Sequence, residues 1–207
     1  MENQTNSIIL FGPSGSGKST LANVLTGTNA FKNENDDFSE TTETIGNPGM
    51  FDDQSVFVID TPGTGNCDCR EPIYLDETIR YIEQCSSIKA FVLVLNYMNN
   101  KVDFHVKKYI EVFKHMYSSE KLIHRFAVVW THYFDILPQQ MKDLYPMKKE
   151  FINEYIKSMM ESELSENDLD AIPHYFVDSK KAKIDDYHSL EELKRFVSWI
   201  SQLQPIN

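Results

Sequence analysis

The stretch that decides the fold is Gly12-Pro13-Ser14-Gly15-Ser16-Gly17-Lys18-Ser19-Thr20, which satisfies the pattern G-x-x-x-x-G-K-[ST]. The apolar run 8–11 precedes it as a candidate strand, and the segment 21–25 that follows is compatible with a helix. In this context consecutive backbone N–H groups and the helix N-terminus face one anion. All nine residues are therefore predicted to bind a nucleoside diphosphate or triphosphate, rather than to form a Gly/Ser-rich turn without a ligand.

Two side chains of this loop have predicted roles of their own. Lys18 is expected to reach the β- and γ-phosphate oxygens, and the hydroxyl of Ser19 is expected to ligate Mg²⁺.

Length and composition suit one soluble α/β domain. The 207 residues are 41% hydrophobic, and we expect 1–207 to form a single domain, with a core of about 7–182 and a C-terminal helix at about 189–203. The formal charge of −11 argues against nucleic acid and against an anionic membrane as partners.

The lack of recognisable targeting signals and the small number of cysteines favour a cytoplasmic protein. Residues 1–6 lack the features of a signal peptide, and no apolar run has the length of a membrane span. Peripheral membrane association would need a partner or a tail beyond Asn207. Cys67 and Cys69 are interpreted as exposed loop thiols, with a redox pair as the alternative.

Apolar runs alternate with amphipathic segments, a pattern that predicts a mostly parallel central sheet with helices on both faces, as in small GTPases and other P-loop NTPases. Strands are predicted at 7–11, 55–60, 90–96, 125–131 and 174–177. Helices are predicted at 18–26, 75–85, 103–116, 138–160 and 189–203. We expect a long loop and a weak edge strand within 31–50, and loops at 63–72 and 161–170.

The segment Asp60-Thr61-Pro62-Gly63 ends the second of these predicted strands. An Asp at this position can hold Mg²⁺ through its water shell, and a Gly three residues later can bring its N–H to the γ-phosphate. Asp60 and Gly63 are predicted to do so.

A hydroxyl from the loop between the two motifs should complete the magnesium shell when a γ-phosphate is present. Thr42 is the predicted residue, and Thr41 and Thr44 are the alternatives.

The base site is predicted from Thr131-His132-Tyr133-Phe134-Asp135, which stands where GTPases carry N-K-x-D. His132 is expected to stack on the purine. A carboxylate, at Asp178 or Asp135, is expected to accept hydrogen bonds from guanine N1 and N2.

These motifs together resemble the immunity-associated nucleotide-binding GTPases, the avirulence-induced and GIMAP group. Further similar blocks lie at 75–80, 90–96 and 128–132, so the resemblance covers about 7–182. A Thr-His base box is also typical of the chloroplast outer-envelope translocon GTPases; septins are more distant relatives.

The resemblance implies GTP and GDP binding with Mg²⁺ and a homodimer formed across the nucleotide face. It places the base on His132, Asp178 and Ser179. Two departures concern guanine specificity: Phe134 stands where the family often has the base-box Asp, and Asp178 where it often has Asn.

Other classes fit less well. The chain has no LSGGQ-type signature of ABC ATPases, and no arginine near 39–44 such as a guanylate kinase needs. Thr64 stands where Ras-like enzymes orient water with Gln, so we expect slow GTP hydrolysis. Thr64 and Arg70, the latter acting from a second protomer, are the catalytic candidates. A nucleotide-gated scaffold with negligible hydrolysis is the alternative.

Overall fold

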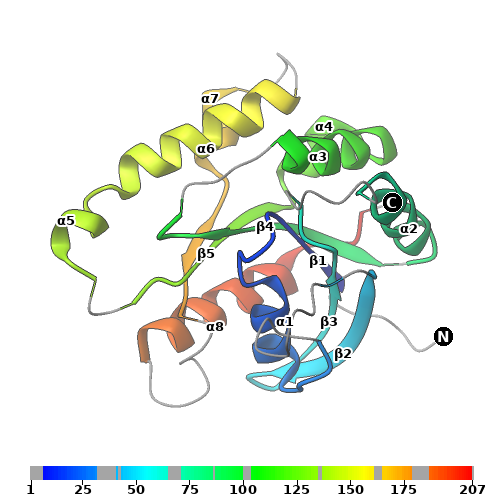
Figure 1. Ribbon diagram of the computed structural model, residues 1–207, viewed down its shortest axis with the longest axis horizontal. Coiled ribbons are helices and arrows are strands. Elements are labelled where there is room, and N and C mark those ends of the chain that lie inside the picture. Colours follow the sequence, from blue (N-terminus) through cyan, green and yellow to red (C-terminus); the bar gives the residue numbers. More distant parts are fainter. Residues whose placement is uncertain are drawn as a thin grey trace.

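The computed structural model describes residues 7–31, 41, 43–64, 71–85, 87–99, 104–134, 137–160, 165–178 and 187–206. Within these residues six strands form one sheet in the order β2-β3-β1-β4-β5-β6 (Figure 1). Strand β2 is antiparallel to β3, and the other neighbouring pairs are parallel. The strands are β1 (Ser7–Phe11), β2 (Ile45–Phe51), β3 (Gln54–Asp60), β4 (Ile88–Asn96), β5 (Phe126–Thr131) and β6 (His174–Phe176).

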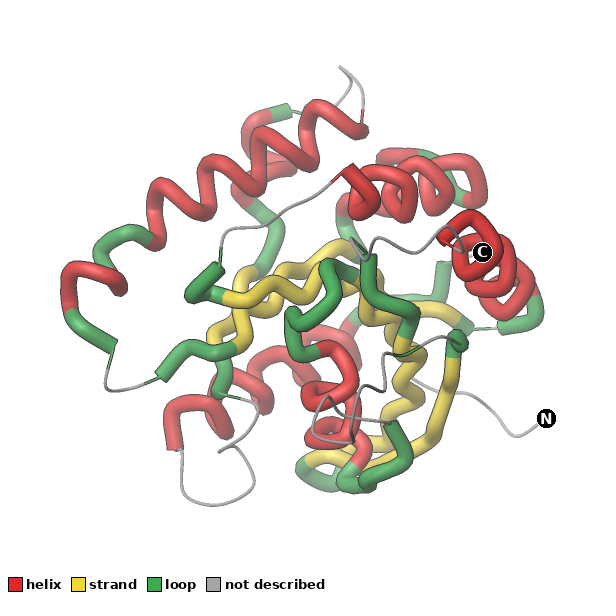
Figure 2. Tube along the Cα trace, viewed as in Figure 1, coloured by secondary structure: helices red, strands yellow, loops and turns green. Residues whose placement is uncertain are grey.

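Helices cover both faces of the sheet, as Figure 2 shows. Helices α1 (Lys18–Thr26) and α8 (Tyr187–Gln202) bury apolar side chains in one core with Ile8, Val92 and Val129. The other core contains alternate residues of the same strands, such as Ile9, and the second set of helices. That set comprises α2 (Glu71–Glu83), α3 (Phe104–Met116), α4 (Ser119–Ile123), α6 (Tyr145–Met160) and α7 (Glu166–Asp170). Strands buried on both faces need continuous apolar runs, which explains why the sequence predicts them well.

The prediction of one continuous helix at 138–160 is wrong. The segment is divided into α5 (Gln139–Lys142) and α6, which begins at Tyr145. Pro146 has no N–H to donate to the carbonyl of Lys142, so a continuous helix would lose that bond and clash with the proline ring. In the first turn of α6, by contrast, a proline is tolerated.

The prediction of a solvated loop at 161–170 is also wrong for the residues that the structure describes, 165–170. Residues 166–170 form α7, whose start is fixed by a capping box in which Ser165 and Asp168 bond each other's backbone. Reciprocal capping satisfies two N–H groups that a short helix otherwise leaves without partners.

The edge strand expected within 31–50 is a full antiparallel strand, β2. It is joined to β3 by a two-residue turn in which both Asp52 and Asp53 have positive φ, 48° and 61°. Two residues with positive φ give the turn twist that matches paired strands. Pro48 lies within β2, which an edge strand tolerates because one of its sides needs no ladder bonds.

No helix among the described residues is both long enough and apolar enough to cross a membrane.

His174 on β6 is a buried titratable group away from the predicted site. Its Nδ1 accepts a hydrogen bond from Trp130 Nε1 at 3.0 Å, and its Nε2 is buried without a partner. Burial, with a smaller contribution from Lys149, lowers the pKa of His174 from 6.5 to about 3. The imidazole is therefore neutral in the folded protein.

We expect this histidine to make folding less stable in mild acid. Between pH 6.5 and 3 the unfolded chain binds a proton that the folded chain does not, so the free energy of unfolding falls as the pH falls. The loss between pH 7 and 5 should be about 2 kcal/mol. Urea unfolding of the wild type and of His174→Asn, whose amide oxygen replaces Nδ1 as acceptor, measures it. An equal pH slope in both proteins would contradict the prediction.

Candidate functional site

The predicted phosphate loop connects β1 to α1 at the carboxyl edge of the sheet, where the parallel strands end. Gly12 begins it with a φ of +147°, and a Cβ there would run into the backbone carbonyl of Val94 on β4. Only glycine fits this position. The backbone of the loop therefore lies directly against β4. All nine predicted residues, Gly12 to Thr20, lie in this loop and the first turn of α1.

Lys18 lies inside this loop, with 5% of its surface exposed. Its Nζ donates to the carbonyls of Gly12 and Pro13 at 3.1 and 3.0 Å. The Ser16 hydroxyl is buried in the same loop and has no partner. A buried cation and a buried, unpaired hydroxyl form a polar centre that suits an anion.

The segment 60–64, which continues from β3, lies against the phosphate loop. Thr64 N–H donates to the Gly12 carbonyl at 3.2 Å, and Ser14 N–H donates to the Thr64 carbonyl at 2.8 Å. A Cβ on Gly63 would lie 2.7 Å from Ser14 Cα and 3.1 Å from Lys18 Nζ. The structure thus brings Gly63, whose N–H is predicted to donate to the γ-phosphate, beside the lysine predicted to bind the same phosphate.

Asp60 ends β3 next to this loop, with 1% of its surface exposed. Its Oδ2 accepts a hydrogen bond from Ser19 Oγ at 2.7 Å, whereas its Oδ1 is buried without a partner. Burial raises the pKa of Asp60 to about 6, although the charge of Lys18 and the Ser19 hydroxyl both lower it. A nearby divalent cation would favour the ionised form instead.

The residues around Asp60 fit a magnesium ion. The donors are oxygen atoms, which Mg²⁺ prefers, and the unpaired Asp60 Oδ1 gives a cation or its water shell a ready acceptor. Ser19 Oγ also lies 3.1 Å from Thr41 Oγ1. No group of three or more His, Cys, Asp and Glu among the described residues could hold a metal. Among the described residues, the candidate site offers the carboxylate of Asp60 and the hydroxyls of Ser19 and Thr41.

The structure describes two of the three threonine candidates. Thr42 lies outside the described residues, and Thr41 contacts Ser19. The hydroxyl of Thr44 instead lies 2.7 Å from that of Thr78 on α2.

Thr42 stays the predicted ligand, and a pair of variants compares it with Thr41. We expect Thr42→Ala to weaken binding of a Mg²⁺-bound GTP analogue about tenfold more than binding of GDP, because its hydroxyl should engage only the triphosphate state. Titration of both nucleotides with both variants measures this. If Thr41→Ala alone discriminates between the nucleotides, the alternative is right.

The predicted base residues lie at the ends of β5 and β6. Tyr133 N–H donates to the Val177 carbonyl at 3.3 Å, which places the 132–133 turn beside Asp178. His132 has a φ of 55°, and its Nδ1 lies 3.0 Å from Thr131 Oγ1. Asp178 is buried, and its N–H donates to Ser189 Oγ at 2.8 Å. His132 and Asp178 are thus neighbours at the sheet edge.

Thr131 is a site residue whose role was not predicted from the sequence. Its hydroxyl donates to the Ser16 carbonyl at 2.6 Å, and its side chain lies 3.3 Å from where a Cβ on Gly17 would be. Thr131 thus ties the base segment to the phosphate loop. The signal for it is its place in the first position of the N-K-x-D-like box, where Thr replaces Asn.

The remaining predicted residues are either described by the structure or lie outside the described part of the chain. Thr64, a catalytic candidate, is buried against the phosphate loop. Arg70, Asp135 and Ser179 lie outside the described residues, as do Cys67 and Cys69.

A family model agrees with this assembly of motifs: the model of the AIG1 family matches residues 6–166. The chain belongs to the AIG1 family. No curated protein matches its sequence.

Solved structures resemble this AIG1 chain over nearly its whole length. Toc33 from Arabidopsis thaliana in complex with GDP and Mg²⁺ gives a TM-score of 0.76 at 14% identity, covering 99% of this chain and 88% of that chain. Toc33 in complex with Mg²⁺ and GMPPNP gives 0.74 at 16%, covering 99% and 88%. A structure of the chloroplast translocon components atToc33 and psToc159, for which dimerization is important for GTPase activity, gives 0.74 at 16%, covering 98% and 87%. At these identities the likeness shows the fold, that of a P-loop GTPase.

Proposed function

We propose that this AIG1 protein binds guanine nucleotides with Mg²⁺, hydrolyses GTP slowly and acts as a GTP/GDP switch that dimerises across its nucleotide face. The observation that carries the proposal is the convergence of three motifs on one sheet edge. Lys18 lies beside Gly63, and Ser19 donates to Asp60. The Toc33 structures, which contain GDP or GMPPNP with Mg²⁺, support the choice of ligand.

In this proposal Gly12 to Thr20 bind the phosphates and Gly63 contacts the γ-phosphate. Ser19 and Thr42 would hold Mg²⁺ directly and Asp60 through water, and the ion would neutralise the phosphate charge. His132, Asp178 and Ser179 would bind the base.

Slow hydrolysis is proposed because the position after Gly63 carries no water-orienting side chain of the Ras type. Thr64 stands there, and its backbone is bonded to Gly12 and Ser14. Dimerization is important for the GTPase activity of atToc33 and psToc159, which supports a contribution from a second protomer here. Arg70 is the proposed residue. A nucleotide-gated scaffold with negligible hydrolysis is the second candidate.

Titration of the protein with GTP, GDP, ATP and GMP, each with and without Mg²⁺, tests the proposal. We expect GTP and GDP to bind at least about 100-fold more tightly than ATP, because a site that hydrogen-bonds guanine leaves groups unpaired with adenine. Mg²⁺ should strengthen GTP binding. Equal affinity for ATP and GTP would contradict a guanine site, and no binding of any nucleotide would contradict the phosphate site as well.

The dependence of turnover on protein concentration separates the two candidate activities. GTP turnover per molecule that rises with concentration indicates hydrolysis assisted by a second protomer. Turnover near zero at every concentration indicates the scaffold.

A further inference from the structure

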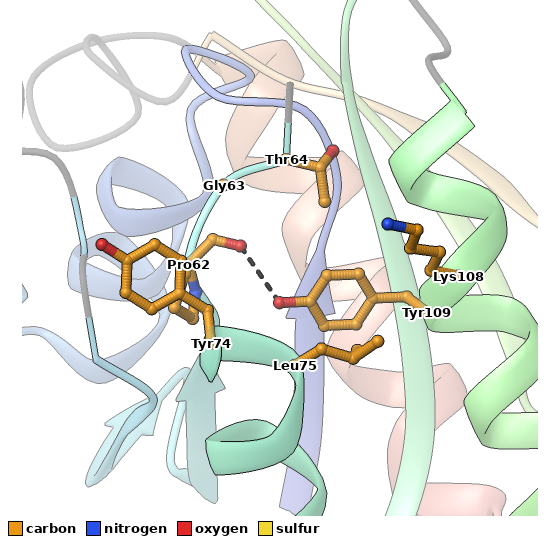
Figure 3. A pocket seen from close by; sticks show the side chains of 7 residues that line it. All are labelled: Pro62, Gly63, Thr64, Tyr74, Leu75, Lys108 and Tyr109. Atoms are coloured by element: carbon orange, nitrogen blue, oxygen red, sulfur yellow. Dashed lines mark hydrogen bonds between the residues drawn. The ribbon is translucent and has the colours of Figure 1, made fainter. Parts of the chain in front are cut away.

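Tyr109 on α3 reaches the segment that carries Gly63. Its hydroxyl donates to the Pro62 carbonyl at 3.3 Å, as the dashed line in Figure 3 shows. Only 4% of Tyr109 is exposed. We propose that Tyr109 is a positioning residue that sets the direction of the Gly63 N–H, and thereby the preference for triphosphate over diphosphate. The inference rests on the proposed function, in which Gly63 contacts the γ-phosphate.

The first step of the argument is the geometry of one peptide bond. The Pro62 carbonyl and the Gly63 N–H belong to the same planar group and point in opposite directions in a trans peptide. Because the Tyr109 hydroxyl holds the oxygen toward α3, the Gly63 N–H faces away from α3. On the same residue, a Cβ would lie 2.7 Å from Ser14 Cα of the phosphate loop.

The second step is that Tyr109 itself is fixed relative to the phosphate loop. Its ring is stacked on Phe11, with centroids 5.9 Å apart and planes at 29°, and it contacts Phe113 at 6.0 Å. Phe11 is the last residue of β1 and immediately precedes Gly12. These ring contacts therefore fix the Tyr109 hydroxyl relative to the phosphate loop, which begins at Gly12.

The third step is that the segment is not closely packed on the side that faces α2 and α3. A cavity of about 20 Å³ lies between 62–64, Tyr74 and Leu75 of α2, and Lys108 and Tyr109 of α3 (Figure 3). That volume holds about one water molecule. On this side the bond from the Tyr109 hydroxyl, rather than close contact, holds the Pro62 carbonyl.

Tyr109→Phe removes only the hydroxyl and tests the inference. We expect affinity for GMPPNP with Mg²⁺ to fall about three- to tenfold, the usual range for one hydrogen bond, and affinity for GDP to change less than about twofold. The matched control is Tyr97→Phe, because Tyr97 is also buried and donates to a backbone carbonyl, that of Met141, at 2.8 Å. The control should leave the GMPPNP-to-GDP affinity ratio unchanged.

Each other result has a defined meaning. If Tyr109→Phe weakens both nucleotides equally, or changes neither, or if Tyr97→Phe shifts the ratio as much, Tyr109 has no positioning role. A wild type that does not bind GMPPNP with Mg²⁺ overturns the proposed function itself. Melting of both variants without nucleotide checks that each folds; a similar small decrease in both is expected.

Discussion

Replacement of Lys18 by Ala should lower affinity for GTP and its analogues at least about 100-fold while leaving the fold intact. Lys18 Nζ donates to the carbonyls of Gly12 and Pro13. Each carbonyl keeps another donor when the lysine is lost: Thr64 N–H for Gly12 and Ser16 N–H for Pro13. The structural cost at these two carbonyls is therefore small. The loss of two charge-assisted bonds to phosphate is large.

Nucleotide titration and thermal melting of Lys18→Ala together measure the two halves of this prediction. Lys194→Ala is the matched control, because Lys194 pairs with Glu191 within α8 and carries the same charge. It should bind GTP as the wild type does. Wild-type affinity in Lys18→Ala would show that this lysine does not bind the phosphate, and loss of its folding transition would show that the fold depends on it.

The sequence predicted the elements that carry the site because each has a strong local signal. Buried parallel strands are continuous apolar runs, and β1 was predicted with its observed bounds, Ser7–Phe11. Asp60 and His132 follow two such runs, so placing them at one sheet edge needed only the rule that parallel strands end together. The structure confirms the α/β P-loop fold with its mostly parallel sheet.

What the sequence missed depends on weak local signals or on distant contacts. The turn between β2 and β3 carries Asp52 and Asp53 instead of the Asn-Gly or Asp-Gly that marks a hairpin. The contact between Thr131 and Ser16 joins residues 115 positions apart. It depends on the register of β4 and β5, in which Asn96 pairs with Thr131, and no short motif encodes that register.

The second large effect is expected at Asp178, which should determine the choice of base. Guanine offers N1–H and N2–H₂ as donors, whereas adenine has an acceptor at N1, so a fixed carboxylate accepts bonds from one and repels the other. We expect Asp178→Ala to reduce the preference for GDP over ADP at least about 100-fold. The bond from the backbone N–H of residue 178 to Ser189 Oγ is kept in alanine.

Titrations of GDP and ADP with three variants separate the carboxylate from the stacking ring. His132→Asn should weaken both nucleotides alike, by about 5- to 100-fold, because it removes a stacking surface that does not distinguish purines. Asparagine tolerates the φ of 55° found at this position better than alanine would.

Asp135→Ala should leave the preference for GDP over ADP unchanged. If Asp135 carries it instead, guanine is recognised by the base segment after β5 rather than by the end of β6. If the wild type itself does not distinguish GDP from ADP, the site is that of a general P-loop NTPase, since the phosphate loop and the Asp60 cluster require no particular base.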